Sequence, residues 1–211
     1  MKPQTKQRLT NDYKFVMLSI LSGVFISIGG WAYLTVGALA GMILFTFGLL
    51  SVVHFGTYLY TGTAGFRFPG KPIKLPFILI FNVVGTIIMG LLSHCLTNPM
   101  MGAAENIAGA RIISGWLNCG LLAIGCGLIM TTAVAFAAKK QYLPLLFGVP
   151  VFIACGFPHS IADAFYYSAC SWEFIHCAFD EILKCWAAVV VGNFIGCNIP
   201  WACGYFLTKD I

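Results

Sequence analysis

A histidine and an aspartate four residues apart carry the most specific chemistry in the sequence. His159 and Asp163 lie within an apolar stretch at 143–168, and their spacing predicts that both share one face of a helix. Ionisable side chains inside a membrane span are costly and are functional candidates by default. Histidine changes its charge between about pH 5 and 8, and a close carboxylate would favour the imidazolium. The pair indicates proton-linked or hydrogen-bonding chemistry. The alternatives are that His159 is a packing histidine with satisfied hydrogen bonds, and that Asp163 lies near an outer mouth or bonds a neighbouring helix break.

Two phenylalanines and an asparagine are further candidates. Phe152 precedes His159 by seven residues, which is two helical turns, and Phe45 precedes Leu59 by fourteen. Paired aromatic rings could close a pore as hydrophobic gates, although each ring alone could equally face lipid or pack. Asn118 lies early in the apolar stretch at 115–137, where an amide also commonly bonds a neighbouring helix.

The composition requires a membrane around these residues. Of 211 residues, 59% are hydrophobic and only 9% are charged, against about 25% charged in ordinary soluble domains. A soluble enzyme is therefore excluded. The nine cysteines show no C-x-x-C spacing, and there is no P-loop, H-E-x-x-H or nucleophile elbow. We expect no enzyme activity, no cofactor, no metal site and no nucleic-acid partner.

Six apolar stretches predict a single all-α transmembrane domain over residues 1–211. All basic residues except Arg111 and Lys184 fall on one side of the spans, together with both termini. Basic residues gather on the cytoplasmic side, so we expect cytoplasmic termini and a multi-pass protein of the inner or plasma membrane. The predicted spans are 15–36, 38–62, 75–95, 115–137, 143–168 and 182–207.

An internal repeat divides the chain into residues 15–95 and 115–207. Gly56–Ala64 and Gly156–Ala164 lie 100 residues apart, and each interrupts the middle span of three. Three spans followed by three predict inverted repeats with broken second and fifth helices, as in transporters; chance similarity is the alternative. Irregular backbone at membrane depth must face protein or a water-filled cavity, and helix ends there could present N–H groups to an anion.

Five motifs resemble those of the formate/nitrite transporter family, in order, over all six spans. The most specific is Gly156–Asp163, G-F-P-H-S-I-A-D, which is similar to the family's G-F-E-H-S-I-A-N. The others are Leu59–Gly62 (similar to L-F-T-G), Ser22–Gly30 (similar to A-G-x-F-I-A-x-G-A), Leu117–Cys119 (similar to the start of C-N-x-x-V) and Gly192–Gly196 (similar to G-N-x-I-G-G).

The resemblance implies a homopentamer in which each protomer is an aquaporin-like pore. Members pass small monovalent anions of weak acids, such as formate, nitrite, hydrosulfide, acetate or lactate. The resemblance assigns His159 as the central pore histidine, Leu59, Tyr60 and Thr61 as a mobile loop, Phe45 and Phe152 as constriction rings, and Asn118 as a polar residue beside the histidine.

Several positions depart from the family pattern. Pro158 replaces the glutamate before the histidine, Asp163 replaces an asparagine, and Tyr60 replaces a phenylalanine and adds a hydroxyl near the path. A lysine usually precedes the fourth helix and draws anions in; Arg111 is the nearest basic residue here. The chain is also short after Thr61, so the second half of the broken second helix is expected to be very short.

The expected function is a channel or transporter for a small monovalent weak-acid anion, linked to protons. A bare anion crossing apolar rings loses hydration at a cost of several kcal/mol, and protonation removes most of that cost. His159 would supply a proton or a hydrogen bond at the pore centre. The alternative is a channel for small neutral solutes without proton coupling.

Overall fold

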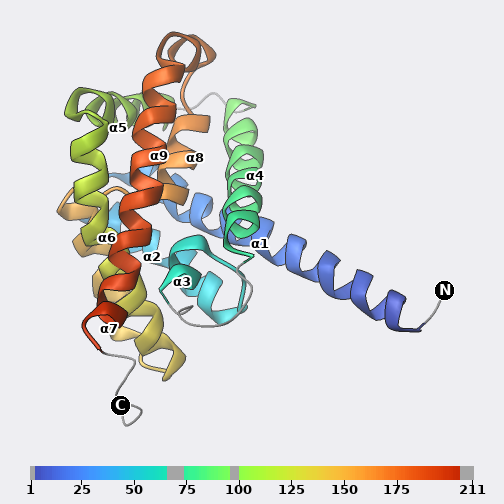
Figure 1. Cartoon of the computed structure of the whole chain (residues 1–211). Helices are drawn as coiled ribbons and strands as arrows, with labels where there is room; N and C mark the ends of the chain where they lie inside the picture. The colour runs from blue at the N-terminus through green and yellow to red at the C-terminus, as the bar shows by residue number, and fades with distance from the viewer. Residues whose placement is uncertain (1–2, 66–73, 96–99, 205–211) are drawn as a thin grey trace.

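The computed structural model describes residues 3–65, 74–95 and 100–204, with side chains from residue 11 onward, and its elements are helices (Figure 1). Four basic residues used for the topology, Lys2, Arg67, Lys71 and Lys209, lie outside the described residues, as do the side chains of Lys6 and Arg8. The helices are α1 (Pro3–Val36), α2 (Ala38–His54), α3 (Tyr60–Ala64), α4 (Leu75–His94), α5 (Met100–Ser114), α6 (Trp116–Ala138), α7 (Leu143–Ala154), α8 (Ser160–Ser168) and α9 (Trp172–Ala202).

Within the described part of the chain, four helices are long and apolar enough to cross a membrane: α1 from Asn11, α4, α6 and α9. The other two predicted spans are each divided into two helices, α2 with α3 and α7 with α8. α2 has 17 residues and α7 has 12, which correspond to about 25 and 18 Å at 1.5 Å per residue. Neither alone covers a hydrocarbon core of about 30 Å.

One helix was not predicted and one predicted boundary was wrong, because polar residues belong to helices. α5 was missed: its alanines, glycines, asparagine and glutamate lack the long apolar run of a span. α9 begins at Trp172 rather than at 182, because Ser171 caps it by accepting a hydrogen bond from the Phe174 N–H at 3.2 Å. The charged residues after Trp172 therefore belong to an extended helix end.

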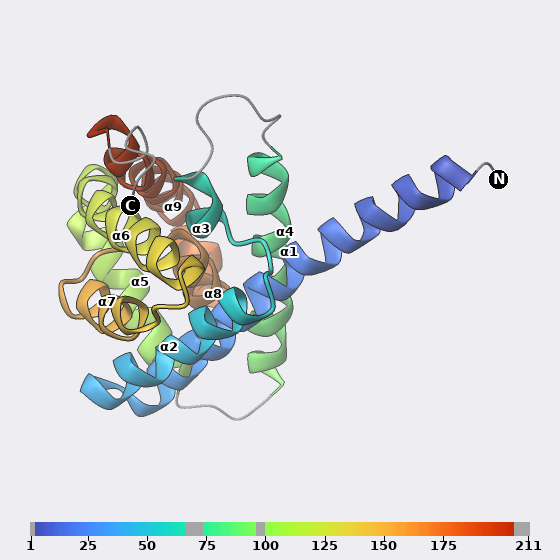
Figure 2. The ribbon, with the colours of Figure 1, turned by 90° about the horizontal axis from the view of Figure 1, so that it is seen from below.

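The long helices pair through small residues. α6 packs along α9, and α1 packs against α2 and α4 (Figure 2). A Cβ added at Gly192 would collide with the Gly120 carbonyl oxygen, and one added at Gly85 would collide with the Ile20 carbonyl oxygen. Glycine at these crossings lets the backbones approach closely, as in other membrane helix pairs. The pairs hold α3, α7 and α8 between them.

The two helix breaks have the same backbone geometry. Two residues after the end of α2 and of α7 stands a glycine in the left-handed region, Gly56 with φ 60° and Gly156 with φ 69°, a conformation that favours glycine. The next N–H then folds back: Thr57 donates to the Val52 carbonyl at 3.0 Å, and Phe157 donates to the Phe152 carbonyl at 2.9 Å. A further helix begins three residues after each of these N–H groups.

A buried asparagine secures the first break. Asn82 of α4 accepts a hydrogen bond from the Tyr60 N–H at 2.9 Å and donates to the Tyr58 and Ser19 carbonyls at 2.8 and 2.7 Å. Its side chain thus pairs backbone groups that the interrupted helix leaves open.

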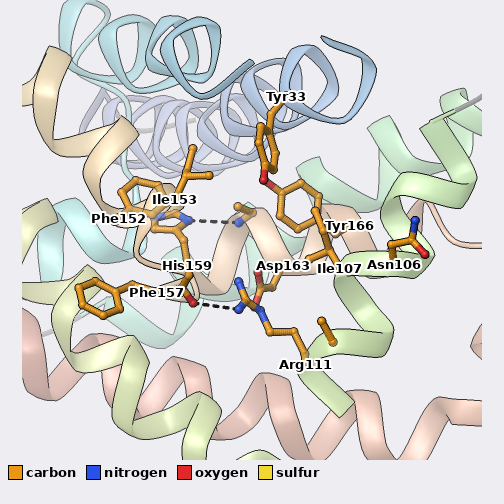
Figure 3. Close-up of a pocket in the computed structure, with 13 residues that line it drawn as sticks. Tyr33, Asn106, Ile107, Arg111, Phe152, Ile153, Phe157, His159, Asp163 and Tyr166 are labelled. Carbon is orange, nitrogen blue, oxygen red and sulfur yellow. Dashed lines mark hydrogen bonds and ion pairs between the residues drawn. The ribbon is translucent and has the colours of Figure 1, made fainter. Parts of the chain in front are cut away.

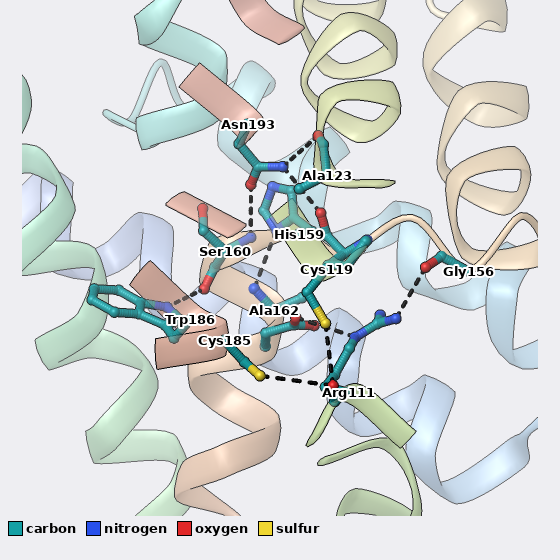
Figure 4. Close-up of polar contacts among 12 residues, drawn as sticks. Arg111, Cys119, Ala123, Gly156, His159, Ser160, Ala162, Cys185, Trp186 and Asn193 are labelled. Atoms are coloured by element: carbon teal, nitrogen blue, oxygen red, sulfur yellow. Dashed lines mark hydrogen bonds and ion pairs between the residues drawn. The ribbon is translucent and has the colours of Figure 1, made fainter. Parts of the chain in front are cut away.

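Asn193 of α9 does the same for the second break (Figure 4). It accepts from the Ser160 N–H at 2.8 Å and donates to the Pro158 and Ala123 carbonyls at 3.0 and 2.9 Å. Both asparagines are fully buried. The N–H groups that open α3 and α8 are therefore held at fixed positions by the neighbouring long helix.

Candidate functional site

A pocket of about 260 Å³ lies beside the second break, on the side of α5 (Figure 3). α5 lies at the end of the molecule opposite the connection between α6 and α7 (Figure 1). The pocket walls come from α1, α5, the end of α7, the break between α7 and α8, and α8 itself. Its lining residues are Tyr33, Asn106, Ile107, Ala110, Arg111, Phe152, Ile153, Gly156, Phe157, His159, Ala162, Asp163 and Tyr166.

His159 is the N-cap residue of α8 and is 2% exposed. Its Nδ1 accepts a hydrogen bond from the Ala162 N–H at 3.1 Å, so the ring proton of the neutral form lies on Nε2. Nε2–H donates to Thr61 Oγ1 at 2.9 Å. This bond joins the second break to α3, and both nitrogens are used with the imidazole uncharged. Protonating Nδ1 would break the cap of α8.

The two candidate phenylalanines meet beside this histidine. The Phe152 ring stacks on the His159 ring with centroids 5.8 Å apart, and the Phe45 ring stands perpendicular to Phe152 at 6.0 Å. Both phenylalanines are buried. The structure thus brings Phe45 of α2 and Phe152 of α7 together at one place next to His159, although α7 ends at Ala154 and no continuous helix joins Phe152 to His159.

Asp163 pairs with Arg111 rather than with the histidine ring. Its Oδ2 lies 3.4 Å from Arg111 Nε, while Arg111 Nη1 donates to the Gly156 carbonyl at 3.0 Å. Asp163 touches His159 through the backbone, where its N–H donates to the His159 carbonyl at 2.8 Å. The expectation that this carboxylate would favour a charged imidazolium is therefore wrong: the carboxylate has a guanidinium partner, and the histidine is bonded as the neutral form.

The predicted loop residues lie on the other side of His159. Leu59 is the buried N-cap residue of α3, and Tyr60 and Thr61 form its first turn rather than a loop. The Tyr60 hydroxyl donates to the Val190 carbonyl of α9 at 3.2 Å, so it turns away from the predicted path. α3 has five residues, as the shortened sequence predicts. Of the three residues, Thr61 bonds the histidine directly.

Asn118 is not brought to His159. It lies on an exposed face of α6 and donates to Ser114 Oγ at 2.6 Å, and it is absent from the lining of the described pocket. Tyr33, Asn106 and Tyr166 line the pocket but were not singled out in the sequence. Tyr33 and Tyr166 lie 133 positions apart in the chain, although their ring centroids are 6.4 Å apart, so only the packing of α1 on α8 could reveal them.

Three N–H groups at the start of α8 are bonded to protein acceptors. Asn193 accepts the Ser160 N–H, the His159 ring accepts that of Ala162, and the His159 carbonyl accepts that of Asp163. The expectation that the helix start presents its N–H groups to an anion therefore fails for these three. At the pocket, the positive group is the Arg111 guanidinium on α5.

The chain resembles known proteins along nearly its whole length. Residues 3–207 match the sequence model of the family described as formate/nitrite transporter. A probable formate transporter from Methanothermobacter thermautotrophicus is 25% identical over 248 residues, covering 92% of this chain and 88% of the relative. A formate-nitrite transporter from Entamoeba histolytica is 28% identical over 215 residues, covering 87% of this chain; the chain spans 60% of that relative's length.

Two solved structures share the fold. A pentameric formate channel with formate bound aligns with a TM-score of 0.75 at 20% identity, covering 94% of this chain and 97% of the channel. An ion channel described as belonging to the FNT family aligns with a TM-score of 0.79 at 19% identity, covering 96% and 92%. The arrangement of helices is therefore the same in chains whose sequences have diverged widely.

Proposed function

The chain belongs to the formate/nitrite transporter family, and on that premise we propose that it carries a small monovalent weak-acid anion across the membrane together with a proton. Formate, nitrite and hydrosulfide are the leading substrates. The observation that carries this proposal is His159, which is buried between the Phe152 ring and Thr61 at the edge of the pocket. It is a polar group beside the two aromatic rings, where a passing solute would lose its hydration.

The transport step follows from the charges of the site. An anion that enters between Phe45 and Phe152 gives up hydration, at a cost of several kcal/mol, unless it is neutralised first. Arg111 stands nearest to the place of the lysine that usually attracts the anion in this family, but Asp163 compensates its charge, so we propose that the solute reaches the two rings already protonated. His159 then offers Nε2–H as a hydrogen-bond donor, exchanging Thr61 for the solute. In this scheme the histidine acts as a neutral donor, which its bond from the Ala162 N–H supports.

The architecture that we propose is a single transmembrane domain over residues 1–211 with inverted repeats at 15–95 and 115–207. Each repeat would cross the membrane three times, with α2–α3 and α7–α8 as the broken second and fifth crossings. The matched glycine turns and asparagine bonds of the two breaks support this scheme.

A homopentamer is the proposed assembly, with one pore per protomer. One structural relative is described as a pentameric formate channel. This chain also exposes large apolar side chains on its long helices, such as Ile87, Leu121 and Val191, which lipid or neighbouring protomers would cover. A detergent-solubilised particle with five times the protomer mass of 22.9 kDa is the expected light-scattering result.

Both termini are proposed to lie in the cytoplasm, with the protein in the inner or plasma membrane. Lys139 and Lys140 follow α6 at the end of the molecule opposite α5 (Figure 1). Basic residues favour the cytoplasmic side. The pocket beside α5 would then face outward.

Flux in proteoliposomes tests the proposed function. Uptake of formate, nitrite, hydrosulfide, acetate and lactate is measured at two pH values, with protein-free vesicles as the control. We expect saturable uptake of at least one acid that rises at the lower pH and moves protons with it. The compensated Arg111–Asp163 pair is the observation that favours the alternative, a neutral-solute channel. Glycerol or urea flux without acid transport and without pH dependence would establish that alternative.

A further inference from the structure

The Arg111–Asp163 pair contains buried donor and acceptor atoms that form no hydrogen bond with any described protein group. Asp163 is 1% exposed, yet neither of its carboxylate oxygens accepts a hydrogen bond from any described residue. Arg111 Nε likewise has no hydrogen-bond acceptor among them, because its 3.4 Å contact with Asp163 is an ion pair without hydrogen-bond geometry. Buried polar groups are nearly always bonded, so unused ones at a pocket wall point to a ligand.

These groups face the pocket. Both residues line it, with Arg111 reaching across from α5 to the first turn of α8 (Figure 3). Arg111 Nη1 is fixed on the Gly156 carbonyl, and the Arg111 carbonyl accepts from the Cys119 thiol at 3.3 Å (Figure 4). Gly156 thus holds the guanidinium through Nη1, while Cys119 bonds the backbone of Arg111 itself, and Nε–H lies beside the carboxylate.

The electrostatic surroundings of the pair are otherwise uncharged. Thiols and phenols carry no charge at neutral pH by their ordinary ionisation, and His159 is bonded as the neutral imidazole. Arg111 is therefore the charge that faces Asp163, and the two cancel. The titratable groups around Asp163 are Arg111 of α5, Cys119 and Cys126 of α6, His159 before α8, Tyr166 and Tyr167 of α8, and Cys185 of α9.

We propose that Arg111 and Asp163 form a two-point subsite for the neutral acid rather than for its anion. Asp163 accepts a hydrogen bond from the O–H of the acid, and Arg111 Nε–H donates one to its doubly bonded oxygen. The ligand class is a small acid with O–H and =O on one atom, such as formic or nitrous acid. This assignment rests on the transport function proposed above and specifies which protonation state the outer pocket selects.

A bare anion fits this subsite poorly. An anion has no proton for Asp163, so it would place like charges side by side in a water-poor pocket. The neutral acid supplies one donor and one acceptor, which match one acceptor and one donor of the pair. A site built to bond an O–H or N–H strongly rejects an analogue that lacks it, because the buried acceptor then stays unpaired.

Formamide and methyl formate separate this idea from simple acid transport in the wild-type protein. Formamide presents N–H and C=O as formic acid presents O–H and C=O, and it does not ionise. Methyl formate keeps the C=O but has no donor. Both are tested as inhibitors of formate uptake in proteoliposomes. We expect formamide to inhibit at about tenfold lower concentration than methyl formate, or better.

Asp163→Asn supplies the second test. It preserves side-chain size but leaves the Arg111 charge uncompensated, so the pocket should then favour the anion. At pH 7.5 the KM for total formate should fall about tenfold, equivalent to about 1.4 kcal/mol. At subsaturating formate, wild-type uptake should fall about tenfold for each unit of rising pH, because the concentration of neutral formic acid falls by that factor. Uptake by the variant should depend less on pH. The matched control is Glu181→Gln, which removes a carboxylate from the exposed pair with Lys184 on α9.

The outcomes separate the subsite from the proposed function. If the wild-type protein transports none of the acids, the proposed function fails. If it transports formate, equal inhibition by formamide and methyl formate overturns the subsite. An unchanged KM and pH profile in a pentameric Asp163→Asn protein overturns it as well. The inhibitor comparison needs no variant, so it decides the matter even if Asp163→Asn does not fold.

Discussion

The two helix breaks share a backbone but not a chemistry. In both, a glycine with positive φ ends one helix, the next N–H folds back, and a buried asparagine bonds the start of the next helix. The N-cap residue is Leu59 in the first break and His159 in the second. Four residues later stand Thr63, whose hydroxyl donates to the Leu59 carbonyl, and Asp163, whose carboxylate faces Arg111.

The features shared by the two breaks hold the backbone, and the side chains that differ form the candidate site. The asparagines and glycines satisfy the demand of lipid that every backbone group be paired, and that demand is the same in both halves. His159 and Asp163 belong to the second break, which borders the pocket beside α5, whereas no residue of the first break lines that pocket. Thr61 connects the two, since it comes from the first break and bonds the histidine of the second. Two breaks with matching backbone hydrogen bonds thus carry different side-chain chemistry.

The largest expected effect tests whether the two breaks depend equally on their buried asparagines. Asn82→Leu and Asn193→Leu each remove three buried hydrogen bonds, and unpaired buried groups cost roughly 1–3 kcal/mol each. Both variants should lose about 3 kcal/mol or more and yield little folded protein, measured by thermal unfolding in detergent. Asn198→Leu is the control, because it loses a local bond to Phe194. A mild effect in one half alone would mean that the breaks are not equivalent.

A smaller effect tests the asymmetry. His159→Phe removes the donor beside Phe152 and should reduce acid flux about a hundredfold, or about 2.7 kcal/mol, in a folded pentamer. His159→Asn keeps an acceptor for the Ala162 N–H, since asparagine caps helices well, and it keeps an N–H donor beside Phe152 in a shorter side chain that does not titrate. It should retain flux within about tenfold, with the wild-type pH profile from pH 5 to 8.

The equivalent position in the first break supplies the control. Leu59→Met conserves volume at an apolar N-cap and should change flux little. A changed pH profile in His159→Asn would mean that the histidine itself titrates during transport, contrary to the neutral-donor scheme. Equal losses at Leu59 and His159 would remove the asymmetry altogether.

The smallest expected effect concerns the glycine with positive φ that is found in both breaks. Gly56→Ala and Gly156→Ala meet no atom within 4 Å, so only the left-handed backbone opposes them. Each should destabilise by about 1–2 kcal/mol, and by similar amounts. Gly102→Ala in α5 also meets no atom but has an ordinary helical backbone, so it should be neutral or stabilising. Differential scanning calorimetry in one detergent would compare the thermal stability of the three variants. If Gly156→Ala destabilises the protein and Gly56→Ala does not, the two turns are not equivalent.

Residue patterns predict the scaffold better than the pocket. Glycine and small polar residues that interrupt apolar runs predict both breaks from the sequence alone, at Gly56–Ala64 in one half and at Gly156–Ala164 in the other. The family resemblance assigns Phe45 and Phe152 as a pair of rings, and the two rings do meet. These features depend on local backbone rules and on spacing, which a sequence displays directly.

The pocket depends on contacts between distant segments. Arg111 stands out in the sequence only as the nearest basic residue, and its bond to Gly156 follows from α5, which the sequence does not reveal as a helix. Asn118 looks suitable by type but lies on an exposed face of α6. The partner of Asp163 could not be deduced either, because a spacing of four from His159 suggests the wrong neighbour. Tertiary packing decides which polar side chains meet.

The order in which the chain is synthesised gives the asparagine bonds a further consequence. During insertion from the ribosome, α7 and α8 emerge before residue 193 does, so their break has no partner for the Ser160 N–H until α9 follows. An open backbone group costs several kcal/mol in hydrocarbon. The nascent second half therefore has to keep its break near water or the translocon until the last helix arrives. Truncation before residue 193 should leave a chain that quality-control proteases degrade.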